Sequence, residues 1–271
     1  MNMQRILLMS LALAICLLTN SAKSSGQPVE SYQNMNQSQR TTFVSVQARR
    51  IARQISGRDY QFTARFETEI QRAVDSYARR IGNNRGDEPE TGDARFVFER
   101  GQTLAPTLMG IFKARGVSPL IGLYLPLVES EYINLQTPNS AGAIGMFQFL
   151  PKTGEHYGLA PDDLLDVPKS ADAAARYIAS SLETFSDDPM KEALALLSYN
   201  RGARNVENDL ALLVNERNRG CSICALTEQK DKLDQNFRDE SVYYVPKFFA
   251  AAIVGENPRA FGLPTQPLSS F

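Results

Sequence analysis

Apolar residues recur at helical spacing through most of this 271-residue chain, and this periodicity constrains its fold more than any other feature. The clearest case is residues 62–81, where apolar side chains return every three or four positions with charged residues between them. Such spacing places an apolar stripe along one side of a helix. No segment alternates apolar and polar residues as a half-buried strand would. The sequence therefore predicts an all-α fold of about ten helices.

Residues 125–151, reading LPLVESEYINLQTPNSAGAIGMFQFLP, hold the most distinctive group of polar residues. An apolar run leads directly into Glu129, and burial at the end of such a run raises the pKa of a carboxyl group, because a low dielectric disfavours its charged form. A protonated carboxyl group in a cleft is what general-acid cleavage of a glycosidic bond requires. Gly142 and Gly145 allow a close backbone approach, and Gln148 offers a neutral donor and acceptor from the same turn.

This stretch resembles the soluble lytic transglycosylase (SLT-domain) family, in particular its membrane-bound lytic transglycosylase D branch. That family places its catalytic Glu before Ser and follows it with a Gly-x-x-Gly-Leu-(Trp/Met)-Gln turn. Glu129-Ser130 and residues 142–148 match both elements, with Met146 and Phe147 in place of the usual Leu and Trp. The resemblance implies a goose-type lysozyme-like helical domain.

Two further family elements follow in the same order. Ser198-Tyr199-Asn200 is similar to the family's Ala-Tyr-Asn at the end of an apolar helix, and residues 244–248 are similar to its aromatic residue before Val-Pro-Lys-Phe. The resemblance covers roughly residues 116–262, which we interpret as the SLT domain. It covers residues 23–115 only loosely, and these are expected to form a linker (residues 24–40) and an N-terminal layer of accessory helices.

The resemblance also implies chemistry. Glu129 would act as general acid and then general base in cleaving the β-1,4 bond between N-acetylmuramic acid and N-acetylglucosamine, leaving a 1,6-anhydromuramyl end. The substrate's own acetamido group can take the place of a second carboxylate in such reactions. Substrate-binding roles are implied for Ser130, Phe147, Gln148, Tyr199, Asn200 and Tyr244.

Several of these residues have a simpler explanation. Ser130 could form a hydrogen bond at a helix end, and Phe147 could be core packing. The Tyr199 hydroxyl is expected to bond the Glu129 carboxyl, although Tyr and Asn also commonly end helices before Gly. Tyr243 competes with Tyr244, because this chain has Ser-Val-Tyr where the family commonly has Thr-Arg-Asn.

Two alternative functions stay open. A hydrolytic lysozyme-type muramidase would need a second carboxylate, for which Glu131 and Asp166 are the nearby candidates. However, two residues along a helix correspond to about 200°, so Glu131 is expected to face away from Glu129 and to be solvated or ion-paired. The second alternative is a non-catalytic peptidoglycan-binding scaffold, which the altered Phe147 and Val242 leave open.

The first 22 residues have the pattern of a secretory signal peptide, with Arg5 before a short apolar run and small or polar residues after it. An uncleaved anchor is the alternative. Cys16 is interpreted as part of the apolar run, although lipidation there stays open. The sequence thus predicts export to the periplasm and leaves outer-membrane association undecided. In an oxidising compartment Cys221 and Cys224 would form a disulfide, which we favour over a redox role for the C-x-x-C spacing.

The remaining features limit partners and domain boundaries. A net charge of −1 gives no reason to expect nucleic acid as a partner. The family resemblance implies peptidoglycan strands as the partner, and an envelope or secretion assembly stays open. No metal-ligand cluster, phosphate loop or nucleophile elbow is recognisable, so no metal or cofactor is expected. The lone His156 is expected at the surface. Residues 217–238 are interpreted as a surface insertion, and residues 263–271 as a tail.

Overall fold

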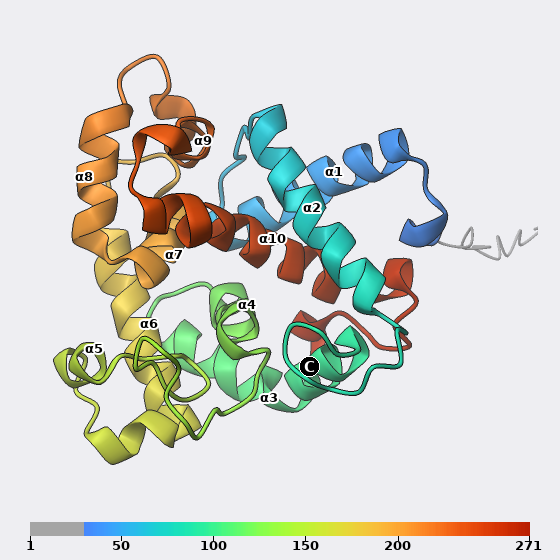
Figure 1. Ribbon diagram of the computed structural model, residues 1–271, viewed down its shortest axis with the longest axis horizontal. Helices are drawn as coiled ribbons and strands as arrows, with labels where there is room; N and C mark the ends of the chain where they lie inside the picture. Colours follow the sequence, from blue (N-terminus) through green and yellow to red (C-terminus); the bar gives the residue numbers. More distant parts are fainter. Residues whose placement is uncertain (1–29) are drawn as a thin grey trace, which may run out of the picture.

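The computed structural model describes residues 30–271, and within that range the protein is all-helical (Figure 1). It has ten α-helices joined by short 3-10 turns, one π-turn and loops, and the described residues contain no strand beyond an isolated bridge between Ile144 and Phe149. The expected all-α class is therefore confirmed. The signal peptide and Cys16 lie outside the described residues. The helices are α1 (Gln37–Ser56), α2 (Ala64–Arg80), α3 (Ala94–Ala114), α4 (Pro119–Ser130), α5 (Pro151–His156), α6 (Val167–Thr184), α7 (Lys191–Arg201), α8 (Ala203–Leu213), α9 (Ser222–Glu228) and α10 (Val242–Glu256).

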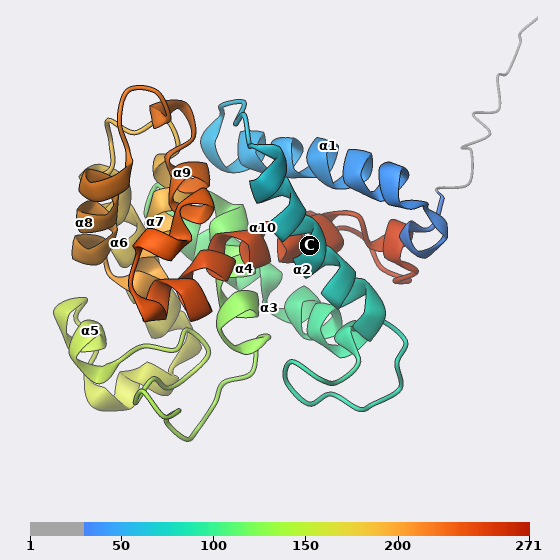
Figure 2. The same ribbon diagram turned by 45° about the horizontal axis from the view of Figure 1, so that its top comes forward.

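Helix α10 forms the centre of the molecule. Tyr243 and Lys247 are its only exposed residues, so the helix is buried on nearly every side. Helices α1, α2, α4 and α7 all pack against it, and α2 lies across it in both Figure 1 and Figure 2. Gly255 permits the contact with α4, because a Cβ there would come within 2.4 Å of the Tyr124 hydroxyl oxygen. A helix that is apolar almost all round is the expected form at the centre of a core.

The N-terminal residues are more ordered than a linker would be. Asn36 caps α1 in a reciprocal arrangement with Gln39, so this helix begins well before the predicted end of the linker. Tyr32 is fully buried against Phe43 and Phe261, and its hydroxyl donates to Asp75 in α2 at 2.8 Å. The linker interpretation of residues 24–40 is thus wrong from Tyr32 onward.

The prediction of a surface insertion at residues 217–238 is wrong for residues 221–228. Helix α9 lies within it and packs between α8 and α2, with most of its side chains buried. Cys221 and Cys224 are joined by a disulfide at the start of this helix, and the Thr63 amide donates to the Cys224 sulfur. The apolar residues that bury α9 are too few, and too closely flanked by polar ones, to produce a clear helical period.

Helix α4 determines where the key carboxyl group lies. It continues through Pro126 as a single helix. It packs closely on α3, since a Cβ at Gly122 would come within 2.4 Å of the Phe112 ring. Glu131 and Tyr132 then adopt left-handed backbone conformations, with φ of 51° and 63°, and end the helix abruptly. No described helix is long and apolar enough to cross a membrane.

Candidate active site

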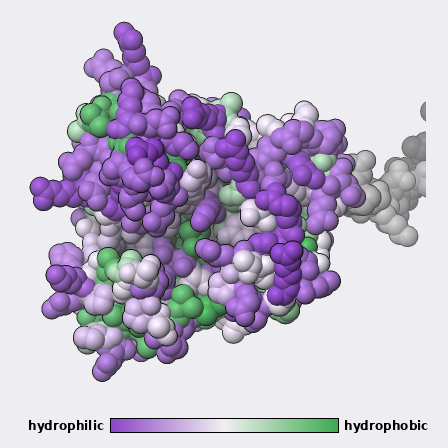
Figure 3. Space-filling view, in the orientation of Figure 1, coloured by the Kyte–Doolittle hydropathy of each residue, from purple (hydrophilic) through white to green (hydrophobic). Residues whose placement is uncertain are grey.

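Glu129, in the last turn of α4, lies where two halves of one cleft meet. The halves have volumes of about 470 and 480 Å³, within the range of small-molecule sites. Figure 3 shows the surface hollowed near the middle of this face. One half lies between α2 and α4, and the other extends toward α5, α7 and the start of α10. Both halves share Glu90, Val128, Glu129, Asn139, Gln148 and Lys247 in their lining.

The environment of Glu129 favours a protonated carboxyl group. Burial raises its pKa from 4.5 to about 7, and the nearby charge of Glu240 acts in the same direction. The Tyr244 hydroxyl and the Lys247 ammonium group oppose this shift by stabilising the charged form. A pKa near neutrality lets one carboxyl group donate a proton and later accept one.

Tyr244, on the first turn of α10, donates its hydroxyl hydrogen to Oε1 of Glu129. Burial, together with the Glu129 charge, raises the pKa of Tyr244 well above its ordinary value, so the phenol stays protonated as a donor. Tyr243 points elsewhere, as an exposed side chain beside Lys230, and does not compete for this role.

The expected hydrogen bond from the Tyr199 hydroxyl to the Glu129 carboxyl is therefore wrong. Its hydroxyl donates to the backbone carbonyl of Phe147 at 2.9 Å, which ties the end of α7 to the turn that follows α4. The side chain still lines the half of the cleft toward α5. Tyr244 takes the place expected for Tyr199, because the start of α10 reaches the Glu129 carboxyl.

Asn200, the next residue, also lines this half of the cleft. Its amide nitrogen donates to Glu240 at 2.8 Å, and its amide oxygen accepts from Ser241 at 2.7 Å. These bonds fix both ends of the amide, and they hold the Glu240 carboxylate at the edge of the cleft.

Phe147 lines neither half of the cleft, and Ser130 lines one half with its hydroxyl already bonded to the backbone. The Ser130 hydroxyl is buried and donates to the Met146 carbonyl at 2.8 Å, which corresponds to the helix-end explanation. Phe147 is fully buried and stacked on Phe112, so the cleft-lining role carried over from the family's Trp is wrong. Its ring points into the core beneath the turn, whereas the neighbouring Gln148 and Phe149 reach the cleft. Met146 is buried, as expected.

Gln148 takes part in both halves of the cleft from a left-handed backbone conformation, with φ of 49°. Its Nε2 donates to the Gly145 carbonyl at 2.7 Å, and its Oε1 accepts from Asn139 at 3.2 Å. Gly145 itself must be glycine here, because its φ is 80° and a Cβ would come within 2.4 Å of the Leu164 carbonyl oxygen. The turn therefore presents one fixed amide pair, Gln148 and Asn139, beside Glu129.

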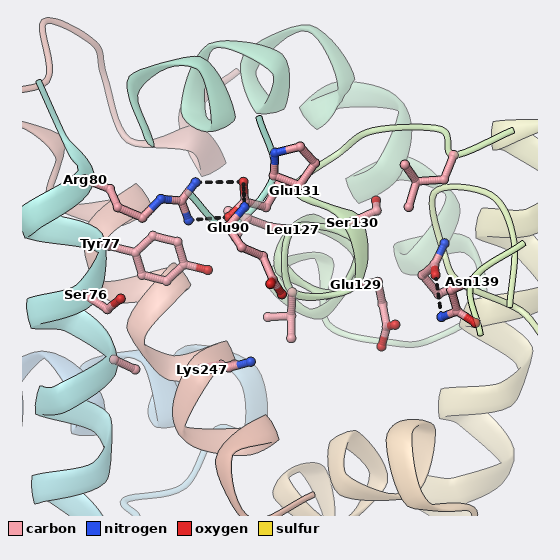
Figure 4. Close-up of a pocket in the computed structure, with 15 residues that line it drawn as sticks. Ser76, Tyr77, Arg80, Glu90, Leu127, Glu129, Ser130, Glu131, Asn139 and Lys247 are labelled. Carbon is pink, nitrogen blue, oxygen red and sulfur yellow. Dashed lines mark hydrogen bonds and ion pairs between the residues drawn. The ribbon is translucent and has the colours of Figure 1, made fainter. Parts of the chain in front are cut away.

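Glu131 faces away from Glu129 and is ion-paired, as predicted, and it is buried rather than solvated. Two nitrogens of Arg80 donate to its carboxylate at 2.5 and 2.9 Å, and the Glu90 amide adds a third donor at 3.3 Å (Figure 4). Asp166, the other candidate for a second carboxylate, caps α6 by accepting from the Lys169 amide and lines neither half of the cleft.

The cleft also contains charged residues to which sequence reasoning gave no role. Glu90 lies in the loop between α2 and α3, Lys247 on α10, and Glu240 in the π-turn before it. Only the family-like run at residues 244–248 drew attention to one of them, Lys247. Within residues 30–271 no group of three or more His, Cys, Asp and Glu residues could hold a metal ion. His156 is exposed against the edge of Tyr157.

Comparison with known proteins agrees with this arrangement. The model of the family described as Transglycosylase SLT domain matches residues 111–217. Membrane-bound lytic murein transglycosylase D of Escherichia coli K12 is 29% identical over 164 residues, which cover 58% of this chain and 33% of that protein. The protein of the same name from E. coli O6:H1 matches equally. The chain thus spans about a third of the length of these curated relatives.

The family match includes Glu129, the turn that carries Gln148, and Tyr199 with Asn200, but it ends before Tyr244 and α10. The helical fold observed here is the lysozyme-like one of that domain. The chain therefore carries a transglycosylase SLT domain and is a distant homologue of membrane-bound lytic murein transglycosylase D.

Proposed function

We propose that this chain is a peptidoglycan lytic transglycosylase, in which Glu129 is both the general acid and the general base. The observation that carries the proposal is the Glu129 carboxyl group itself. It is half-buried where the two halves of the cleft meet, its pKa is raised to about 7, and a tyrosine hydroxyl binds one of its oxygens. The SLT-domain match and the relatives' name support the substrate class.

The geometry suggests how the proton moves. Tyr244 donates to Oε1 of Glu129, so the carboxyl proton belongs on the other oxygen. Glu129 gives that proton to the bridging oxygen as the bond from C1 of N-acetylmuramic acid breaks, and the substrate's acetamido group stabilises C1. The Glu129 carboxylate then takes the proton of the muramyl 6-hydroxyl, whose oxygen attacks C1. The 1,6-anhydro ring closes, no water is consumed, and Glu129 is protonated again.

Asn139 and Gln148 are proposed to contact the sugar next to Glu129. Their side-chain amides line both halves of the cleft and bond each other, which leaves donor hydrogens on both residues for N-acetyl and hydroxyl groups. Asn200 and Tyr199 line the cleft on the side of α7, where they form a wall with Glu240. Ser130 and Phe147 support the turn from beneath rather than contact substrate.

The products of digested sacculi test the reaction. We expect purified protein to release muropeptides one water lighter than those released by lysozyme, and Glu129→Gln to release none, because the amide cannot exchange the proton. Glu155→Gln is the matched control, since this exposed residue of α5 lines neither half of the cleft. Products with reducing ends would instead show hydrolysis. Wild-type protein that releases nothing while still binding sacculi would favour the non-catalytic scaffold.

Export to the periplasm is part of the same proposal, because peptidoglycan lies outside the cytoplasmic membrane. Intact-mass analysis of the protein from a periplasmic extract would show the mature N-terminus, expected directly after Ala22. Recovery of the full-length chain from the cytoplasm alone would contradict export.

A further inference from the structure

The half of the cleft between α2 and α4 has a wall that lies outside the matched SLT domain. Tyr77 and Arg80 of α2, together with Pro89 and Glu90 of the following loop, form this wall opposite α4. Residues of the N-terminal layer therefore line the same cavity as Glu129. This half of the cleft therefore depends on parts of the chain to which the family match assigns nothing.

The loop that carries Glu90 is held in place at several points. Arg80 binds the Glu131 carboxylate with two nitrogens and donates from its third to the Gly92 carbonyl at 2.9 Å. The Glu90 amide also donates to Glu131, and Asp93 at the loop's end accepts from the Gly82 amide at 2.9 Å. Glu90 therefore lies on a loop that is already ordered, so a ligand that binds it does not lose affinity to the cost of ordering the loop.

Two opposite charges face this cavity without partners of their own. In Figure 4 the side chains of Glu90 and Lys247 both extend toward the space beside Glu129. Among the described residues, neither the Glu90 carboxylate nor the Lys247 ammonium group forms an ion pair or a side-chain hydrogen bond. Arg80 and Glu131, by contrast, neutralise each other. The cavity also has an apolar part, formed by Leu127 and Val128 from α4 and Leu135 from the turn.

This chemistry does not match that of an uncharged sugar. Hydroxyl and acetamido groups are recognised by neutral donors and acceptors, such as Asn139 and Gln148 on the neighbouring wall. A separated carboxylate and ammonium group that face one cavity, beside the apolar side chains of α4, instead complement a ligand that has both charges and some apolar surface. A short peptide with a free amino group and free carboxylates has these properties.

We propose that this half of the cleft is a subsite for the peptide carried by the muramyl residue, in which Lys247 binds a peptide carboxylate and Glu90 binds a peptide ammonium group. The proposal rests on the proposed function and deepens it, because it makes the N-terminal layer a determinant of which glycan strands are cut. Both side chains are exposed to the solvent of the cleft, so each ion pair contributes modestly.

The test compares two substrates, glycan strands that carry their peptides and the same strands freed of peptides by an amidase. The measured quantity is the ratio of kcat/KM for the peptide-bearing strands to that for the peptide-free strands, because any effect of Lys247 on Glu129 cancels in it. We expect Glu90→Gln and Lys247→Met each to lower this ratio about 2- to 5-fold, and the double variant to lower it about 10-fold. Glu90→Lys should lower it further than Glu90→Gln.

Glu88→Gln, in the same loop but outside the cavity lining, is the matched control and should leave the ratio unchanged. A ratio that none of the cavity variants changes would overturn the peptide subsite while leaving the proposed reaction intact. If the wild-type protein does not cleave glycan strands, calorimetric titration of the free stem peptide into Glu129→Gln still tests whether the cleft binds the peptide. Peptide binding that Glu90→Gln and Lys247→Met weaken supports the subsite, and the absence of binding overturns it.

Discussion

At the scale of single residues, the reactivity of Glu129 is set by groups from several parts of the chain. Burial at the end of α4 and the charge of Glu240 raise its pKa, whereas the Tyr244 hydroxyl and Lys247 lower it. The balance lies at about pH 7, where a carboxyl group can serve as acid and as base. No motif of neighbouring residues could produce this balance alone.

Removing the Tyr244 hydroxyl should shift the pH dependence of the reaction. The hydroxyl stabilises the charged form of Glu129, so Tyr244→Phe raises the pKa of Glu129 above about 7. A hydrogen bond to a charged group contributes about 1.5–3 kcal/mol, so the alkaline limb of kcat/KM should move up by roughly one to two pH units. Tyr199→Phe is the matched control, because that hydroxyl donates to a backbone carbonyl instead. An equal shift in both variants, or none in Tyr244→Phe, would contradict the assignment.

Glu129 should also make stability depend on pH. Its pKa in the folded protein, about 7, lies above the ordinary value of 4.5, so the folded state holds the proton more tightly than the unfolded state. Its contribution is fully present below about pH 4.5 and is lost as the pH rises through about 7. The Glu129→Gln variant has no carboxyl group to ionise at this position, so it does not lose this stability. At pH 8 it should therefore be about 1–3 kcal/mol more stable than wild type. Urea unfolding of both proteins at pH 4.5 and pH 8 measures the difference, and a gap that does not grow with pH would refute the argument.

The sequence predicted which residues belong to this site better than it predicted their hydrogen-bond partners. Glu129 and Gln148 were predictable because each belongs to a local sequence feature. Glu129 ends the apolar run of α4, and Gln148 ends the glycine-containing turn of residues 142–148. Tyr199 and Tyr244 were both placed in the cleft, but which hydroxyl reaches Glu129 depends on how α7 and α10 pack around α4. Glu90 had no signal at all, since its loop resembles any polar connection. Its place in the cleft follows only from the contacts made by Arg80 and Glu131.

At the scale of elements, the buried pair of Arg80 and Glu131 joins α2 to the end of α4. Its side chains are 13% and 8% exposed, and the Arg100 guanidinium also donates to the Glu131 carbonyl at 3.0 Å. Helical spacing correctly predicted that Glu131 turns away from Glu129. The depth at which it is buried was not predictable, because α2 and its loop cover it from a distant part of the chain.

This pair should show strong coupling in a double-mutant cycle. Removing one partner leaves an uncompensated buried charge, so Arg80→Met and Glu131→Met should each destabilise the protein by about 3 kcal/mol. Replacing both removes that charge, and the double variant should be at least about 1 kcal/mol more stable than the sum of the two losses predicts. Urea unfolding at pH 7 supplies the four free energies. Strictly additive losses would show that the two residues contribute independently.

At the scale of the whole molecule, the N-terminal helices are part of one continuous core with the SLT domain. Helix α2 packs across α10, and Tyr32 is buried between Phe43 and Phe261. The Tyr60 hydroxyl donates to the buried Glu192 of α7 at 2.6 Å. Without α1 and α2, the apolar faces of α10 that they cover would be exposed to water. An accessory layer was expected because the family resemblance covers residues 23–115 only loosely. The packing shows that α10 is buried almost all round, in part by these helices.

A continuous core predicts a single unfolding transition for the chain from residue 30 onward. The helical signal in circular dichroism reports all ten helices, and tyrosine absorbance reports the core, since the chain has no Trp and ten Tyr residues. The two urea curves should coincide, because α2 and α10 cannot separate without exposing buried apolar surface. A fragment beginning at Phe112 should lack cooperative unfolding, since it keeps α4 and α10 but loses the helices that cover them. Two separated transitions, or a fragment that unfolds as sharply as the whole chain, would mean that the N-terminal layer is a domain of its own.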